Sequence, residues 1–301
     1  MRRLSNFGFG LGGLVGIVLL LFACGGEGDR QTPDSSSTAA SGSNPSGGTG
    51  PTTQNNGPAA PTASPGTFRF DTAVLVDPHV FLTNNDGTKA DLTTVCNQVF
   101  SELNTKDQFT TQAQQGADGI LDMSIIGVFR PLDTQAESVQ AELTVAHCQA
   151  PYPSTGCIPV NQAVALSAKV HNKNADCFKP YAGTTGGYSP APNNPTGRCF
   201  VSDAADLTLP LLAGISIPFK QGKVAASYEG AKPTQLTSGI ISAFLSEEQA
   251  QNTRFPTDIP LLGGQPISVL FKVEDMDQLV GGQKGWWLYF NFSASSVPYT
   301  E

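Results

Sequence analysis

Residues 286–292 read Trp-Trp-Leu-Tyr-Phe-Asn-Phe, and this stretch decides the fold. Successive side chains of a β-strand point to opposite faces, so the stretch presents two different surfaces. Every even-numbered position carries an aromatic ring or a leucine, whereas the odd-numbered positions are Trp287, Tyr289 and Asn291. A strand with this pattern buries its even face in a core and carries two large aromatic residues on its other face.

The same period-two alternation recurs along most of the chain after residue 66. Alternation of this kind is typical of antiparallel sheets that bury one face in a core and expose the other to solvent. A continuously apolar run at residues 120–129 predicts a central strand. Turns are expected at 213–214 and at Gln221-Gly222. The alternating stretches are residues 68–76, 139–145, 164–170, 207–211, 215–219 and 224–228.

Two stretches instead show helical spacing of apolar residues. Residues 92–103 form one such stripe after Asp91, a plausible N-cap, and residues 236–245 form the other. Ser246-Glu247-Glu248-Gln249 is a capping box that predicts a further short helix. The expected fold is mainly β, an antiparallel β-sandwich or sheet with two or three packed helices, in a single domain of residues 67–301.

The N-terminus carries a targeting signal. Arg2 and Arg3 precede an apolar stretch at 7–22, which ends in Leu21-Phe22-Ala23-Cys24. This resembles the lipobox of bacterial lipoproteins, which implies removal of residues 1–23 and lipidation of Cys24. By the same resemblance, Gly25 rather than Asp favours the outer membrane. The alternative is an uncleaved membrane helix, but the run is shorter than the roughly 20 residues that a spanning helix needs.

Residues 24–66 have the composition of a tether. They are almost wholly Gly, Ser, Thr, Pro, Asn, Gln and Ala, and such a segment cannot bury enough apolar surface to fold. The whole chain has 301 residues, of which only 14% are charged, and a net charge of −8. An acidic chain lacks the basic face that phosphate backbones require, so nucleic acid is excluded as a partner.

Five cysteines remain once Cys24 is assigned to lipid. An oxidising envelope favours disulfides. The count alone allows many pairings. We expect Cys148–Cys157 and Cys177–Cys199, because each pair closes a loop that is rich in small and polar residues. Cys96 lies on the apolar stripe of a predicted helix and is expected to be a buried small hydrophobe.

The candidate site residues have two interpretations each. Trp287 and Tyr289 form either a sugar-stacking platform or a surface covered by another element. Asp118 and Asp122 match the closing half of an acidic calcium loop, or else a simple turn before a strand. A second acidic group, Glu274-Asp275-Asp277, offers further oxygens or a solvated turn. No other cofactor is expected, because the three histidines show no metal-ligand spacing.

The chain therefore predicts a lipid-anchored protein of the cell envelope that displays a β-rich domain for binding or surface structure, with a polysaccharide or a protein as ligand. Segments 77–81, 128–133 and 183–190 resemble pieces of envelope lipoproteins without known activity. The alternative is an extracytoplasmic hydrolase of an envelope or extracellular polymer. Its acid and base residues cannot be assigned, because Asp71, Asp77, Asp122 and Asp133 are scattered along the chain.

Overall fold

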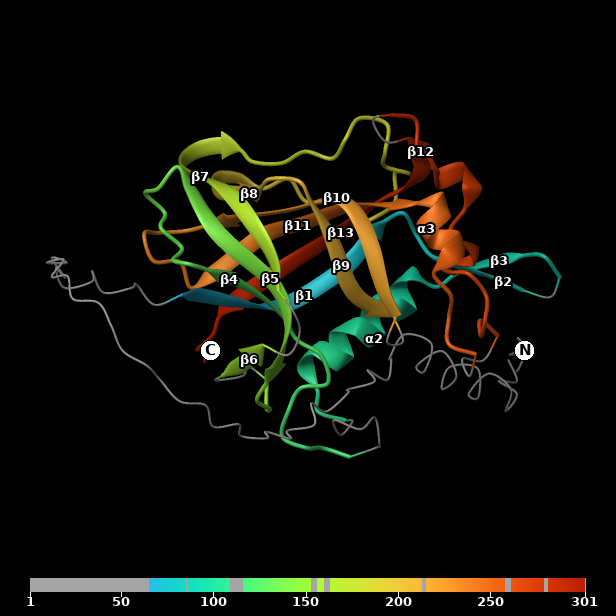
Figure 1. The fold of residues 1–301 in the computed structure, drawn as a ribbon, viewed down its shortest axis with the longest axis horizontal. Helices are drawn as coiled ribbons and strands as arrows, with labels where there is room; N and C mark the ends of the chain where they lie inside the picture. The colour runs from blue at the N-terminus through green and yellow to red at the C-terminus, as the bar shows by residue number, and fades with distance from the viewer. Residues whose placement is uncertain are drawn as a thin grey trace, which may run out of the picture.

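The computed structural model describes residues 65–84, 86–108, 116–152, 156–159, 163–212, 215–257, 261–278 and 281–300, with the side chains of 209–215 left aside. The predicted signal peptide, Cys24 and nearly all of the predicted tether lie outside this range. Within it the chain is mainly β, as predicted, but its main sheet closes into an eight-stranded barrel (Figure 1). The expectation of a sandwich or an open sheet was wrong.

Every neighbouring pair of strands around the barrel is antiparallel. β1 closes the ring because Phe68 pairs with Gly127 of β4 on one side and with Ser296 of β13 on the other. Alternation cannot distinguish this arrangement from a sandwich, since both bury one face of each strand, but closure removes the sheet edges. In spatial order the barrel strands are β1 (Gly66–Asp77), β4 (Ile125–Phe129), β5 (Ser138–Cys148), β7 (Val164–Asp176), β8 (Thr196–Ser202), β10 (Ile215–Tyr228), β11 (Gln235–Ser246) and β13 (Lys284–Ser296).

Smaller elements surround the barrel. Strands β9 (Ala205–Leu212), β12 (Asp277–Gln278) and β6 (Cys157–Pro159) pair with β10, β13 and β5 respectively. A separate hairpin joins β2 (Phe81–Thr83) to β3 (Lys89–Asp91). The helical elements are α2 (Thr93–Thr105), α3 (Glu247–Asn252) and the 3-10 turns η1 (Ile267–Leu270) and η2 (Val273–Asp275). No helix in the described part of the chain is long and apolar enough to cross a membrane.

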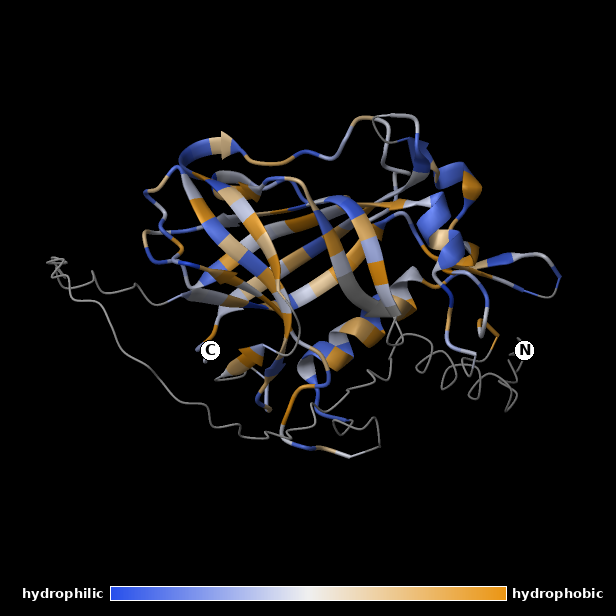
Figure 2. Ribbon diagram, viewed as in Figure 1, coloured by the Kyte–Doolittle hydropathy of each residue, from blue (hydrophilic) through white to orange (hydrophobic). Residues whose placement is uncertain are grey.

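The barrel interior is a packed core, and the alternation of apolar and polar residues along its strands is visible in Figure 2. Trp286, on the inner face of β13, is 2% exposed. Its ring stacks on Phe271 with a centroid separation of 5.1 Å, and its indole N–H donates to the Lys272 carbonyl at 2.8 Å. The segment after α3, which includes Phe271 and Lys272, therefore covers the even-numbered face of β13 at one end of the barrel.

The helix predicted at residues 236–245 is strand β11, so that prediction was wrong. From Ile240 to Ser246 every residue is buried, because the inner face of β11 enters the core while its outer face is covered as well. A strand buried on both faces loses its alternation and can match a helical spacing by chance.

The turn expected at Gln221-Gly222 is also absent. β10 continues through it with a register shift, at which Gln221 adopts a φ of 50°.

The helix predicted at 92–103 is confirmed as α2, although its N-cap is Leu92 rather than Asp91. This helix packs along the part of β1 that follows Arg69, where β1 no longer pairs with β4. The Asn97 side chain donates to the Leu75 carbonyl and accepts from the Leu75 N–H, at 2.7 and 2.9 Å. Asn104 donates to the Phe70 carbonyl at 2.7 Å. Two helical amides thus replace the missing strand partner.

Two further local predictions can be compared with the structure. The capping box at the start of α3 is confirmed, since the Gln249 N–H donates to Ser246 Oγ at 3.1 Å. The continuous apolar run at 120–129 forms a strand only from Ile125. Ile120 makes an isolated bridge to Gln149. Leu121 is buried against the outside of the barrel, which accounts for its apolar character.

Candidate functional site

A long connection crosses the outer surface of the barrel, and we call it the strap (residues 177–195). It leaves β7, runs along the top of the view in Figure 1 towards β12, and returns to β8. Both predicted disulfides are confirmed, and one of them, Cys177–Cys199, joins the start of the strap to β8. The other, Cys148–Cys157, joins β5 to β6. Cys96 lies on α2 outside both bridges.

The strap buries the two aromatic residues of the odd face of β13. Trp287 is 4% exposed and Tyr289 is completely buried. The Tyr181 ring lies 4.3 Å from that of Trp287, measured between centroids. The Tyr289 hydroxyl accepts from the Tyr181 N–H at 3.1 Å and hydrogen-bonds the Thr184 hydroxyl. Burial raises the pKa of Tyr289 to about 12. The structure thus shows the second interpretation, a covered surface, and not an open stacking platform.

The far part of the strap is held by a group of residues that we call the carboxyl latch: Asp77, His79, Tyr188, Asp275 and Asp277. The Gly186 N–H donates to Asp77 Oδ2 at 2.7 Å. The Tyr188 hydroxyl donates to Asp275 Oδ2 at 2.8 Å, and its ring stacks on His79 at 3.9 Å between centroids. Asp277 accepts from the Trp287 N–H at 3.0 Å. The latch joins the strap to β1, β12 and β13.

Two carboxyls of the latch are costly to ionise. Burial, opposed in part by the Gly186 N–H and reinforced by the charge of Asp275, raises the pKa of Asp77 to about 6. Burial raises the pKa of Asp277 to about 6 as well, and the charges of Asp77 and Asp275 add to this effect. Burial and the hydrogen bond to Asp275 raise the pKa of Tyr188. Sequence reasoning considered these carboxylates separately and could not bring them together, because they are about 200 residues apart along the chain.

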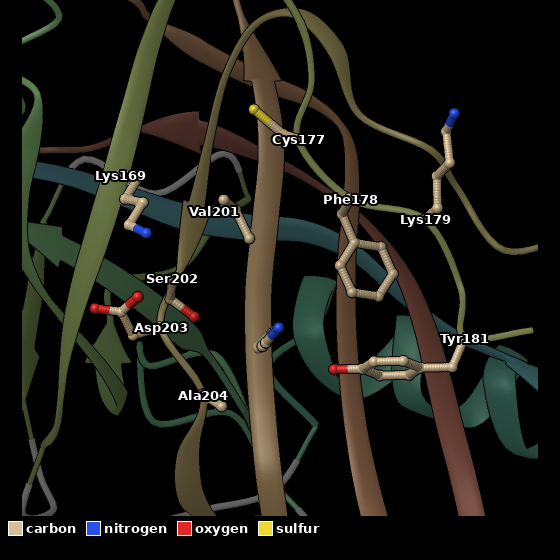
Figure 3. A pocket seen from close by; sticks show the side chains of 10 residues that line it. Lys169, Cys177, Phe178, Lys179, Tyr181, Val201, Ser202, Asp203 and Ala204 are labelled. Atoms are coloured by element: carbon tan, nitrogen blue, oxygen red, sulfur yellow. The ribbon is translucent and has the colours of Figure 1, made fainter.

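Beside the strap the outer wall of the barrel carries a cavity of about 340 Å³, which we call the strap cavity. Val201 of β8 pairs with Lys169 of β7 on one side and with Ala225 of β10 on the other. In Figure 3, Lys169, Ser202 and Asp203 lie on one side of this space, and Phe178 and Tyr181 lie on the opposite side. The lining residues are Lys169, Cys177, Phe178, Lys179, Tyr181, Val201, Ser202, Asp203, Ala204 and Lys223.

In the described part of the chain, two ammonium groups of the strap cavity have no ionic partner. Among the described residues, no carboxylate lies within 4 Å of the Lys169 or Lys223 Nζ. Lys223 Nζ instead lies 5.7 Å from the centroid of the Tyr181 ring. Lys179 differs, because it pairs with Asp176 at 2.9 Å and points away from the cavity in Figure 3. The cavity thus concentrates positive charge on an acidic chain.

A second cavity, of about 330 Å³, lies between β10 and α3. Its lysine, Lys220, is already paired with Asp206 at 2.5 Å, and Glu248 also lines it. Among the described residues it therefore lacks the unpaired positive charge of the strap cavity.

The residues proposed for calcium lie in a compact turn. Asp118 accepts from the Ile120 N–H at 3.0 Å, and its own N–H donates to Asp107 at the same distance. Asp122 accepts from the Gln108 N–H at 3.0 Å. These contacts are those of a turn before a strand. In the described ranges, no three His, Cys, Asp or Glu side chains are grouped so as to hold a metal ion.

Comparisons with protein-family models, with curated proteins and with solved structures found no match for this chain. The strap, the carboxyl latch and the strap cavity are the features of the structure that bear on function.

The raised pKa values of the latch predict an unusual dependence of stability on pH. The folded chain takes up protons on Asp77 and Asp277 near pH 6, whereas the unfolded chain does so only near the ordinary value of 3.8. The free energy of unfolding should therefore increase as the pH falls from 7 towards 4.5, by on the order of 1–3 kcal/mol. Urea denaturation at several pH values measures it.

Asp77→Asn should remove much of this increase, because the amide oxygen still accepts from Gly186 while the titrating group is gone. Asp203→Asn, at an exposed carboxylate outside the latch, is the matched control and should leave the increase in place. A wild-type stability that decreases steadily between pH 7 and pH 4.5 would contradict the assignment.

Proposed function

We propose that this chain is a lipid-anchored protein of the bacterial cell envelope that displays the barrel as a binding domain, with the strap cavity as its ligand site. The lipobox-like Leu21-Phe22-Ala23-Cys24 supports an anchor, and the composition of residues 24–66 supports a tether between anchor and barrel. The two disulfides are consistent with an oxidising compartment. The outer membrane is the proposed site of attachment.

The observation that carries the binding role is that Lys169 and Lys223, which have no ionic partner among the described residues, lie beside an aromatic wall. Ligand sites combine apolar walls with a few polar groups, in cavities of roughly 300–1,000 Å³. The strap cavity is open to solvent and lies near the lower end of this range at about 340 Å³, with Phe178 and Tyr181 as its apolar wall. Two ammonium groups that line one cavity repel each other, and an anion between them would relieve this.

The alternative of a hydrolase is less well supported. Its best acid and base candidates are Asp77 and Asp277, whose pKa values suit proton transfer near neutral pH. However, Asp77 is only 2% exposed, and both carboxylates accept backbone N–H groups of the strap or β13. These contacts favour a role in holding the strap, so binding is the proposed function.

Filling the strap cavity should abolish binding without unfolding the chain. Ala204 lines the cavity and is exposed, so Ala204→Trp places an indole in the ligand space without entering the core. We expect the wild type to bind at least one member of a panel of neutral and acidic envelope and extracellular polysaccharides, and Ala204→Trp to bind it at least tenfold more weakly. Biolayer interferometry on immobilised polymers measures this.

Ala231→Trp is the matched control, because Ala231 is exposed and does not line the strap cavity. It should bind as the wild type does. Equal binding of Ala204→Trp and the wild type would refute the strap cavity as the site, and failure of the wild type to bind any polymer would refute the proposed function.

Cys24→Ala tests the anchor. Lipidation requires the thiol of this residue, so cells expressing the variant should incorporate no labelled palmitate into the chain, whereas the wild type should be labelled. Cys96→Ala is the control for a cysteine outside the signal. Equal labelling of Cys24→Ala and the wild type would rule out the lipid anchor.

A further inference from the structure

We infer that the ligand of the strap cavity is a monoanionic sugar, the uronic acid unit of an acidic polysaccharide. This inference rests on the proposed function and names the chemistry of its ligand. Three features of the cavity support it: the spacing of Lys169 and Lys223, the aromatic wall that faces Lys169, and a single carboxylate at the rim.

The two unpaired lysines can reach one anion together. Lys169 and Ala225 flank Val201 on adjacent strands, and Lys223 lies two residues before Ala225 on the same outward face. Strand spacing and rise place the Lys169 and Lys223 Cα atoms roughly 12 Å apart. Flexible four-carbon stems allow both ammonium groups to turn towards a carboxylate between them. The geometry therefore suits one compact anion rather than a long row of charges.

The opposite wall suits a ring with one apolar face. Phe178 is buried and Tyr181 is half-buried, and both line the cavity near the start of the strap. Its hydroxyl and its π face match the mixed surface of a sugar, which has C–H groups on one face and hydroxyls at its edge. The proximity of Lys223 to this ring keeps the charge beside the stacking surface.

Asp203 selects the charge of the ligand. It is exposed and lines the same cavity as Lys169 and Lys223, so the unpaired charges there are two positive and one negative. A carboxylate accepts hydrogen bonds from sugar hydroxyls, and it repels a phosphate dianion or a densely sulfated chain more strongly than it repels a ligand with a single carboxylate. A sugar that carries one carboxylate and several hydroxyls can pair its carboxylate with Lys169 and Lys223 and donate a hydroxyl to Asp203.

The test compares a monoanionic sugar with its neutral ester. Galacturonic acid and its methyl ester share their ring and hydroxyls, and only the acid is anionic at pH 7.5. Isothermal titration of the full chain in detergent should show binding of the acid and at least tenfold weaker binding of the ester. Lys169→Gln and Lys223→Gln should each weaken binding of the acid about two- to fivefold, and the double variant more than either. Lys89→Gln, an exposed lysine on β3, should have no effect.

Three other outcomes separate an error in the proposed ligand from an error in the proposed function. Equal binding of the acid and the ester, sensitive to Ala204→Trp, would overturn the anionic ligand but keep the strap cavity as a binding site. Absence of any binding to the acid, the ester or neutral polymers would overturn the proposed function itself. Binding to phosphatidylglycerol vesicles but not to the acid, lost in the double lysine variant, would show that the anion is a lipid phosphate and would overturn the sugar.

Discussion

The pairing of β1 with β13 is the constraint on which the rest of the structure depends. It closes the barrel, and closure gives every strand one face in the core and one face outside. β13 is apolar on both faces, so its outward Trp287 and Tyr289 need a second cover. The strap supplies that cover, and the Cys177–Cys199 disulfide holds its start while the carboxyl latch holds its middle. The strap cavity depends on this cover, because Phe178 and Tyr181 of the strap form one of its walls.

Much of this structure could be predicted from local pattern, and the failures have a physical cause. Strands with one wet face, such as β5 and β7, were predicted because their alternation is set by burial on one side only. β11 was predicted as a helix because both of its faces are buried, a property set by elements distant in sequence. Barrel closure was not predicted, since the inner face of a barrel strand and that of a sandwich strand carry the same residues.

The residues of the candidate site are brought together almost wholly by contacts between segments that are far apart in the sequence. The disulfide pairings could be predicted because each closes a short polar loop. Lys169 and Lys223 could not be singled out, because a lysine on an alternating strand is the ordinary outward residue. What distinguishes them is their shared position beside Val201 and the aromatic wall of the strap. Asp77 and Asp277 likewise acquire raised pKa values only when the strap and β13 bury them together.

The central claim is that the strap buries the outward face of β13, and Trp287→Ala tests it most directly. If Trp287 is packed beneath Tyr181 and against Phe244, its truncation leaves a cavity and should lower the free energy of unfolding by about 3–5 kcal/mol in urea. Val273→Ala, at a side chain that is 70% exposed, provides the reference for a surface truncation. A Trp287→Ala variant as stable as the wild type would show that the ring is not buried, and would contradict the account of the strap.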